Sequence, residues 1–185
     1  MITDLLRRTL SYRHLVKRQT KYVWWKATRQ PFARTQTGVD LIHTWVRFEY
    51  PVVNDPTPTL IDSKPENRRR AAERINGLIL RPGEIFSFWQ RLGRPSRGSG
   101  SGDGLCPIAG LLFNLALESG CKVIERHSLS PGRDATVAWI NKDLTFVNST
   151  GILLRLTVEA EDHRVVGSIQ SAVPMPHKVQ VENLK

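Results

Sequence analysis

Three residues of types that cooperate in nucleophilic catalysis follow one another in the second half of the chain: Cys106, His127 and Asp134. In such a set a thiolate attacks a carbonyl carbon, an imidazole takes up and returns the proton, and a carboxylate orients the imidazole. The sequence therefore predicts a site centred on a cysteine, and its chemistry would be acyl transfer or amide hydrolysis.

Cys106 stands between a glycine-rich segment and an apolar run, in the stretch "GDGLCPIAG" at residues 102–110. Pro107 suits the first position of a helix, and Gly120 suits its C-terminal cap. A cysteine at or beside the N-cap faces the positive end of the helix dipole and unpaired backbone N–H groups, which favour the thiolate. Backbone N–H groups near residues 104–108 would also donate to an oxyanion.

Each of these residues also has an ordinary structural interpretation. A cysteine at the start of a buried helix can simply pack there, His127 lies in a turn, "ERHS", and Asp134 can cap the strand that follows it. If the site exists, we expect substrate contacts from Gly104, Ser128 and Thr136. The sequence leaves both interpretations open.

The order of the elements predicts an α+β fold in which a buried central helix packs on an antiparallel sheet. The helix after Cys106 is apolar on every side and must therefore be central. A second helix is expected from Ser63, with Glu66 in capping-box spacing, through Ile79 to the turn "RPGE". Alternation over residues 40–53 predicts a strand whose buried face carries Ile42, Thr44, Val46, Phe48, Tyr50 and Val52.

Short strand-like runs fill the last third of the domain. They are "ATVAWI", "LTFV", "ILLRLTVEA" and "VVGSIQSA", and their connections "NKD" and "EDHR" resemble hairpin turns. With 185 residues, of which 40% are hydrophobic, the chain suits one packed domain with a separate arm. We expect an arm over residues 1–34, a domain over 35–173 and a tail over 174–185.

The positive charge is concentrated in the arm. Residues 1–34 hold nine Lys and Arg residues against Asp4 alone, so +8 of the formal net charge of +10 lies there and +2 in the rest. A basic helical arm with this amphipathic pattern could bind an anionic membrane surface or pack on the domain. The residues expected to contact a membrane are Arg7, Arg8, Lys17, Arg18, Lys21, Trp24 and Trp25.

Several classes of function find no support in the sequence. Nucleic acid ranks last as a partner, because the domain carries little net charge and no reading motif. No cysteine and histidine cluster has zinc spacing, and "GSGSGDG" lacks the Lys and Ser or Thr of a phosphate-binding loop, so neither a metal nor a cofactor is expected.

The two cysteines and the hydropathy indicate the compartment. Cys106 and Cys121 would stand about 20 Å apart at the two ends of one helix, too far for a disulfide, which suits a reducing interior. No run approaches the roughly 20 apolar residues of a membrane span. We expect a cytoplasmic protein, peripheral on the inner membrane face if the arm binds lipid.

Several blocks together resemble the signature of the VanW family, which is named from vancomycin-resistance gene clusters. They are "NRRRAAERINGLILRPGEIFSFWQRLG", "GLC", "ERHS", "GRDATV" and "DLTFVNST", and the similarity covers about residues 35–170. The resemblance implies a bacterial envelope role in the context of glycopeptide resistance. It suggests peptidoglycan precursor peptides as the substrate or ligand; the alternative is a non-enzymatic accessory protein docked on the membrane by its arm.

The chain departs from the family pattern around the expected site. The last five positions of the family block Gly-Gly-Gly-(Ile/Leu)-Cys-Gln fall on residues 103–107, where the cysteine is kept as Cys106 and the glutamine is replaced by Pro107. The segments before Cys106 and after Ser128 are shortened to "RPSRGSGSGD" and "LSPGR". Such losses commonly remove the walls of a substrate pocket.

Overall fold

The computed structural model describes residues 33–35, 41–52, 64–93, 104–128, 132–139 and 141–175; the predicted arm to residue 32 and the tail beyond 175 lie outside them. The helices are α2 (Lys64–Ile75), α3 (Phe88–Leu92) and α4 (Cys106–Glu118). The strands are β1 (Arg34–Thr35), β2 (His43–Pro51), β3 (Leu78–Leu80), β4 (Ile85–Ser87), β5 (Lys122–Glu125), β6 (Thr145–Val147), β7 (Leu154–Ala160) and β8 (Arg164–Ser171).

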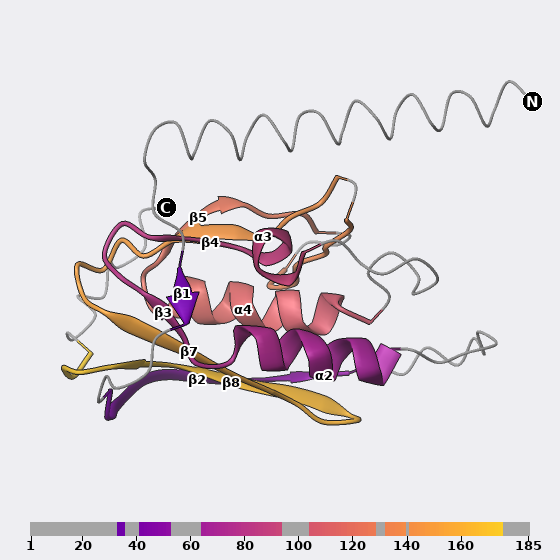
Figure 1. Cartoon of the computed structure of the whole chain (residues 1–185), viewed down its shortest axis with the longest axis horizontal. Coiled ribbons are helices and arrows are strands. Elements are labelled where there is room, and N and C mark those ends of the chain that lie inside the picture. Colours follow the sequence, from indigo (N-terminus) through magenta and orange to yellow (C-terminus); the bar gives the residue numbers. More distant parts are fainter. Residues whose placement is uncertain are drawn as a thin grey trace, which may run out of the picture.

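The described part has a mixed α+β architecture with two antiparallel sheets. The larger sheet has the strand order β1-β3-β7-β8-β2, and the smaller has the order β4-β6-β5. Figure 1 shows α4 between the two sheets, with α2 beside it. Helix α4 contacts β2 and β8 on one side and β5 on the other, and α2 lies against β7. No helix among the described residues is long and apolar enough to span a bilayer.

Helix α4 is the buried centre of the domain, as its composition predicts. All nine residues from Ile108 to Ala116 are buried. The helix ends as Gly120 suggests: at φ 80° this residue allows the Gly120 N–H to donate to the Leu117 carbonyl (3.3 Å) and the Cys121 N–H to the Ala116 carbonyl (2.9 Å). At its start, Leu105 is the N-cap, Cys106 the first helical residue and Pro107 the second.

A β-bulge at Trp45 reverses the predicted face of the first part of β2. The register against β8 shifts between Thr44 and Val46. Before the bulge Ile42 is 77% exposed, whereas Trp45 is buried and its indole N–H donates to the Val173 carbonyl (2.7 Å). The prediction is wrong for Ile42 and Thr44 because one extra residue shifts the alternation. After the bulge it is confirmed by the core contacts of Val46, Phe48, Tyr50 and Val52.

The helix expected through Ile79 ends earlier, at Ile75. Gly77, at φ 75°, turns the chain, and the next three residues form β3. All three are buried. Periodicity alone cannot distinguish a strand from a helix in so short an apolar run. Glu66 pairs with Arg70 (2.7 Å), while its expected capping partner, Ser63, lies outside the described residues.

Three of the four predicted strand runs near the C-terminus form strands, β6, β7 and β8. The β7–β8 connection is the predicted hairpin, closed by the Glu161 N–H and the Arg164 carbonyl (2.9 Å). The run "ATVAWI" is not a strand; within its described residues only the isolated bridge between Ala138 and Lys142 is sheet-like. The Thr136 N–H of this run donates to the His127 carbonyl (2.7 Å).

The fit of α4 on the larger sheet depends on a glycine in β8. A Cβ at Gly167 would lie 2.7 Å from the Thr157 carbonyl oxygen, 3.0 Å from Leu111 Cδ2 and 3.1 Å from Leu115 Cδ1. The carbonyl belongs to the neighbouring strand, so it cannot move away without disturbing the sheet. Gly167 therefore sets how closely α4 approaches β8.

We predict that Gly167→Ala destabilises the domain. Alanine gains about 0.5–1 kcal/mol over glycine in a strand, but the steric overlap costs about 1–3 kcal/mol, so the overlap should dominate. Urea unfolding measures the difference. Val166→Thr, the adjacent and partly exposed position, keeps a β-branched side chain and serves as the control. A Gly167→Ala protein as stable as the original would refute the close approach.

Candidate functional site

One face of α4 carries Cys106, Gly110 and Asn114 on successive turns, because residues four apart share a helix face. The ring of Tyr50, from β2, lies on this face. A Cβ at Gly110 would stand 2.8 Å from two of its ring carbons and 3.1 Å from its hydroxyl oxygen. Gly110 lies one turn after Cys106 on this face, so the Tyr50 ring packs about one helical turn from Cys106.

The surroundings of the Tyr50 phenol favour its neutral form. Burial raises its pKa above the usual value, and the charges of Asp134 and Cys106 raise it further. The phenol therefore stays protonated at neutral pH and can donate a hydrogen bond. Among the described residues its hydroxyl has no hydrogen-bond partner.

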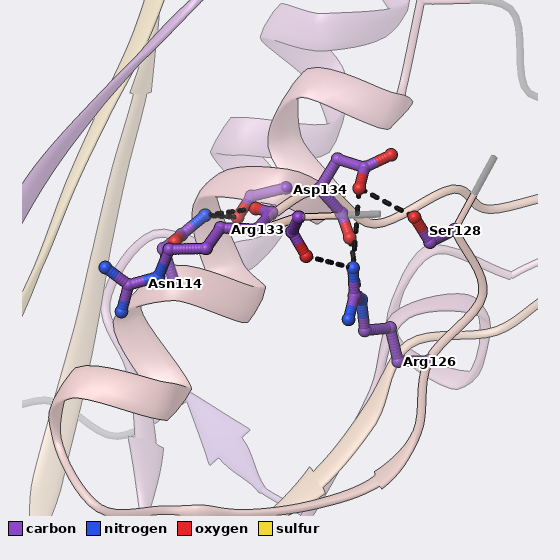
Figure 2. Close-up of polar contacts among 7 residues, drawn as sticks. Asn114, Arg126, Ser128, Arg133 and Asp134 are labelled. Atoms are coloured by element: carbon purple, nitrogen blue, oxygen red, sulfur yellow. Dashed lines mark hydrogen bonds and ion pairs between the residues drawn. The ribbon is translucent and has the colours of Figure 1, made fainter. Parts of the chain in front are cut away.

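Asn114 ties the segment that carries Asp134 to the helix. Its side chain is only 1% exposed, and its Nδ2 donates to the carbonyls of Gly110 and Arg133, both at 2.7 Å (Figure 2). The two carbonyl acceptors fix which end of the amide is nitrogen. The Oδ1 atom is buried without a hydrogen-bond partner in the described part of the chain.

Arg126 fixes the position of Asp134 from the other side. Its guanidinium lies over the Phe113 ring of α4, 4.4 Å from the centroid, and its Nε donates to the Asp134 carbonyl (2.8 Å). Nη2 donates to the Gly132 carbonyl and pairs with Asp134 Oδ1 (3.4 Å), which also accepts from Ser128 Oγ (2.6 Å) (Figure 2). Donors from two directions thus hold the carboxylate.

His127 has a different carboxylate partner from the one the sequence suggested. Its Nε2 lies 3.1 Å from Glu125 Oε1, which also accepts from the Asp143 N–H (3.3 Å). Within the described residues no hydrogen bond joins His127 to Cys106 or Asp134. The ring is therefore oriented by Glu125.

The expected site residues thus fall into two groups. Cys106 and Asp134 both act on the Tyr50 phenol, and Ser128 bonds to Asp134. In the other group the Thr136 N–H donates to the His127 carbonyl, and Gly104, at φ 79°, makes the turn that precedes α4. Sequence reasoning missed three residues of this site: Tyr50, Asn114 and Arg126.

The missed residues left different signals in the sequence. Asn114 is an amide within an apolar helix, and Arg126 belongs to the quoted block "ERHS", so both could have been selected. Tyr50 alternates regularly with apolar residues and gives no sign of a second role. The described part of the chain holds no group of three His, Cys, Asp or Glu side chains that could bind a metal.

The geometry predicts how the Tyr50 phenol titrates. Asp134→Asn removes one negative charge but keeps an acceptor for Ser128 and Arg126, so the phenolate becomes less unfavourable and the Tyr50 pKa falls. The Tyr50 pKa is measured by ultraviolet titration of tyrosinate. The signal of Tyr50 is isolated by subtracting the titration curve of the same protein with Tyr50→Phe. Glu159→Gln, at an exposed position of β7, is the control of equal charge change. An unchanged Tyr50 pKa in Asp134→Asn would contradict the arrangement.

Comparisons with known proteins identify the family. The family model described as "VanW like protein" matches residues 63–101 and 96–170. The vancomycin B-type resistance protein VanW of Enterococcus faecalis (strain ATCC 700802 / V583) is 28% identical over 137 residues, covering 58% of this chain and 49% of that protein. The uncharacterized protein YoaR of Bacillus subtilis (strain 168) is 31% identical over 108 residues, covering 46% and 36%.

This chain therefore spans about half or less of the length of these two relatives. No solved structure matches it. The family match, however, extends over more than half of the chain and includes α4 and the segments of Arg126 and Asp134. The chain belongs to the VanW-like family.

Proposed function

We propose that this chain acts on peptidoglycan precursor peptides, or related envelope peptides, with Cys106 as the nucleophile. The observation that carries the proposal is that the Tyr50 ring packs on Gly110, one turn after Cys106 on the same helix face. Asn114 of that face holds the segment that carries Asp134. The relation to a protein named for vancomycin resistance favours a cell-wall substrate. Acyl transfer or amide hydrolysis is the class of reaction.

The proposed reaction begins with the thiol. His127 takes the proton from Cys106, and Sγ forms a bond to the carbonyl carbon while the carbonyl electron pair moves to oxygen. The C–N bond then breaks, the proton passes from His127 to the leaving amine, and a thioester remains on Cys106. Water, or an acceptor amine, attacks the thioester and restores the thiol.

The contacts of the site favour particular roles in this reaction. Glu125 orients the His127 ring, because its carboxylate contacts Nε2. Asp134, fixed by Arg126 and Ser128, adds negative charge beside the Tyr50 phenol. In this proposal the orienting carboxylate is therefore Glu125 rather than Asp134.

The start of α4 supports anion binding at the same place. Leu105 offers no side-chain oxygen to the first-turn N–H groups, and Pro107 has no N–H. Donors there would stabilise the oxyanion that forms as sulfur attacks. The unsatisfied Oδ1 of Asn114, on the same helix face, costs about 1–3 kcal/mol when left unpaired, a cost more often found at functional sites.

A stem peptide of peptidoglycan with an activated thioester at its C-terminus tests the proposal. We expect it to acylate Cys106 about ten-fold faster than a scrambled peptide with the same thioester. The Cys121→Ser protein should keep this selectivity, and Cys106→Ala should lose the adduct. His127→Ala should react about 100-fold more slowly. Intact-mass and peptide mass spectrometry follow the adduct, and equal rates for both peptides would overturn the proposal.

The charge of the arm favours a second candidate function, docking on an anionic membrane. The arm carries +8 of the net charge of +10 and the tryptophans Trp24 and Trp25. Each basic residue near an anionic lipid surface contributes about 1 kcal/mol. This function does not require Cys106, so the two candidates can be tested separately.

Sedimentation with vesicles tests membrane docking. We expect the full chain to bind vesicles that contain phosphatidylserine and to dissociate as the salt concentration rises, since salt screens the attraction. Replacing Lys17, Arg18 and Lys21 by Gln should weaken binding by about 3 kcal/mol. Replacing Arg69, Arg70 and Arg155 by Gln removes equal charge from the domain as a control. Equal binding to neutral phosphatidylcholine vesicles would refute electrostatic docking.

A further inference from the structure

The hydroxyl of Tyr50 has a position that packing alone does not require. The ring lies directly on Gly110, so a side chain at position 110 of α4 would overlap with the ring. Glycine in the middle of a helix costs about 1 kcal/mol relative to alanine, so this contact is kept at a cost in helix stability. Phenylalanine would fill the same space, yet the residue is a tyrosine.

Tyr50 is only partly buried, and within the described residues its hydroxyl has no hydrogen-bond partner in the protein, so it can donate to a bound group. Asp134 and Cys106 both act on the charge of the phenol. The ring packs on Gly110, one turn after Cys106, which is the first residue of α4. A donor that lacks a partner among the described residues thus lies about one helical turn from the proposed nucleophile.

We propose that the Tyr50 hydroxyl donates a hydrogen bond to the oxyanion that forms when Cys106 attacks a peptide carbonyl. This inference rests on the proposed function and adds a donor to it. No proton leaves Tyr50: the O–H bond persists while the S–C bond forms and while the oxyanion collapses to the thioester. The raised pKa of the phenol keeps the proton in place at neutral pH.

The neighbouring residues explain why a phenol suits this position. A lysine or arginine here would form an ion pair with Asp134, whereas a neutral phenol can turn to a carbonyl oxygen that becomes negative. Gly110 lets the ring approach the helix, and Asn114 holds the Asp134 segment against the next turn. The donor is therefore fixed by backbone and ring packing before substrate arrives, as transition-state stabilisation requires.

Two reactions of Cys106 separate this role from packing. Acylation by the stem-peptide thioester passes through an oxyanion, whereas alkylation by iodoacetamide displaces iodide at a saturated carbon and forms none. In the Cys121→Ser protein, we expect Tyr50→Phe to slow acylation on the order of 100-fold and to leave alkylation at the same pH unchanged. Phe48→Leu, two residues along the same face of β2, should change neither rate.

The outcomes are distinct. If the unchanged Tyr50 protein is acylated and Tyr50→Phe is acylated equally fast, the role of Tyr50 is refuted while the proposed function stands. If both reactions slow together in Tyr50→Phe, Tyr50 only shapes the helix start, and the inference fails. If Cys106 of the protein with Tyr50 is not acylated at all, both the proposed function and this inference fail.

Discussion

The close approach of α4 to the larger sheet is the constraint on which the rest of the domain depends. Two glycines permit it from opposite sides. Gly167 of β8 leaves room for Leu111 and Leu115 of the helix, and Gly110 of the helix leaves room for the ring of Tyr50. Interiors are packed like organic crystals, so a single added methyl group at either position has no space to occupy. The helix and β2 are thereby placed in a fixed relation, and Cys106 and Tyr50 with them.

The second sheet and the loops then complete the site around this helix. Arg126 follows β5 directly and reaches across to the segment at residues 132–134, while Asn114 holds the same segment from α4. The stacking of Arg126 on Phe113 uses its flat guanidinium, which lysine could not replace. Asp134 is thus positioned by groups from two separate elements, although the sequence places it in a short glycine-containing loop.

The blocks that resemble the family signature divide into scaffold and site. In "DLTFVNST", Asp143 accepts from Ser87 Oγ (2.7 Å) and the Trp89 N–H (3.1 Å), which fixes the start of α3. Asn148 of the same block donates to the carbonyls of Leu80 (2.9 Å) and Ile152 (2.7 Å). These polar residues are buried because they bond backbone groups that would otherwise lack partners. The blocks "GLC", "ERHS" and "GRDATV" instead supply the residues around Cys106.

The sequence by itself determined the features that follow from local pattern. An apolar helix that begins near Cys106 and ends just before Gly120 must be central, and the alternation from Val46 onward correctly assigned the core face of β2. The pattern could not reveal the bulge at Trp45, because nothing local marks the extra residue. Nor could it show that the apolar run after Gly77 is a strand, since burial on both sides removes the periodic signal.

The site could be predicted only in part. Residue type and order selected Cys106, His127 and Asp134, but only tertiary structure decided which carboxylate contacts His127 and which side chain lies beside Cys106. Tyr50 stands 56 positions before Cys106 in the sequence and joins it because β2 packs on α4 through Gly110. Contacts of this kind depend on how distant elements pack, and no local propensity encodes them. The sequence therefore specified the reactive residues, and the fold decided their partners.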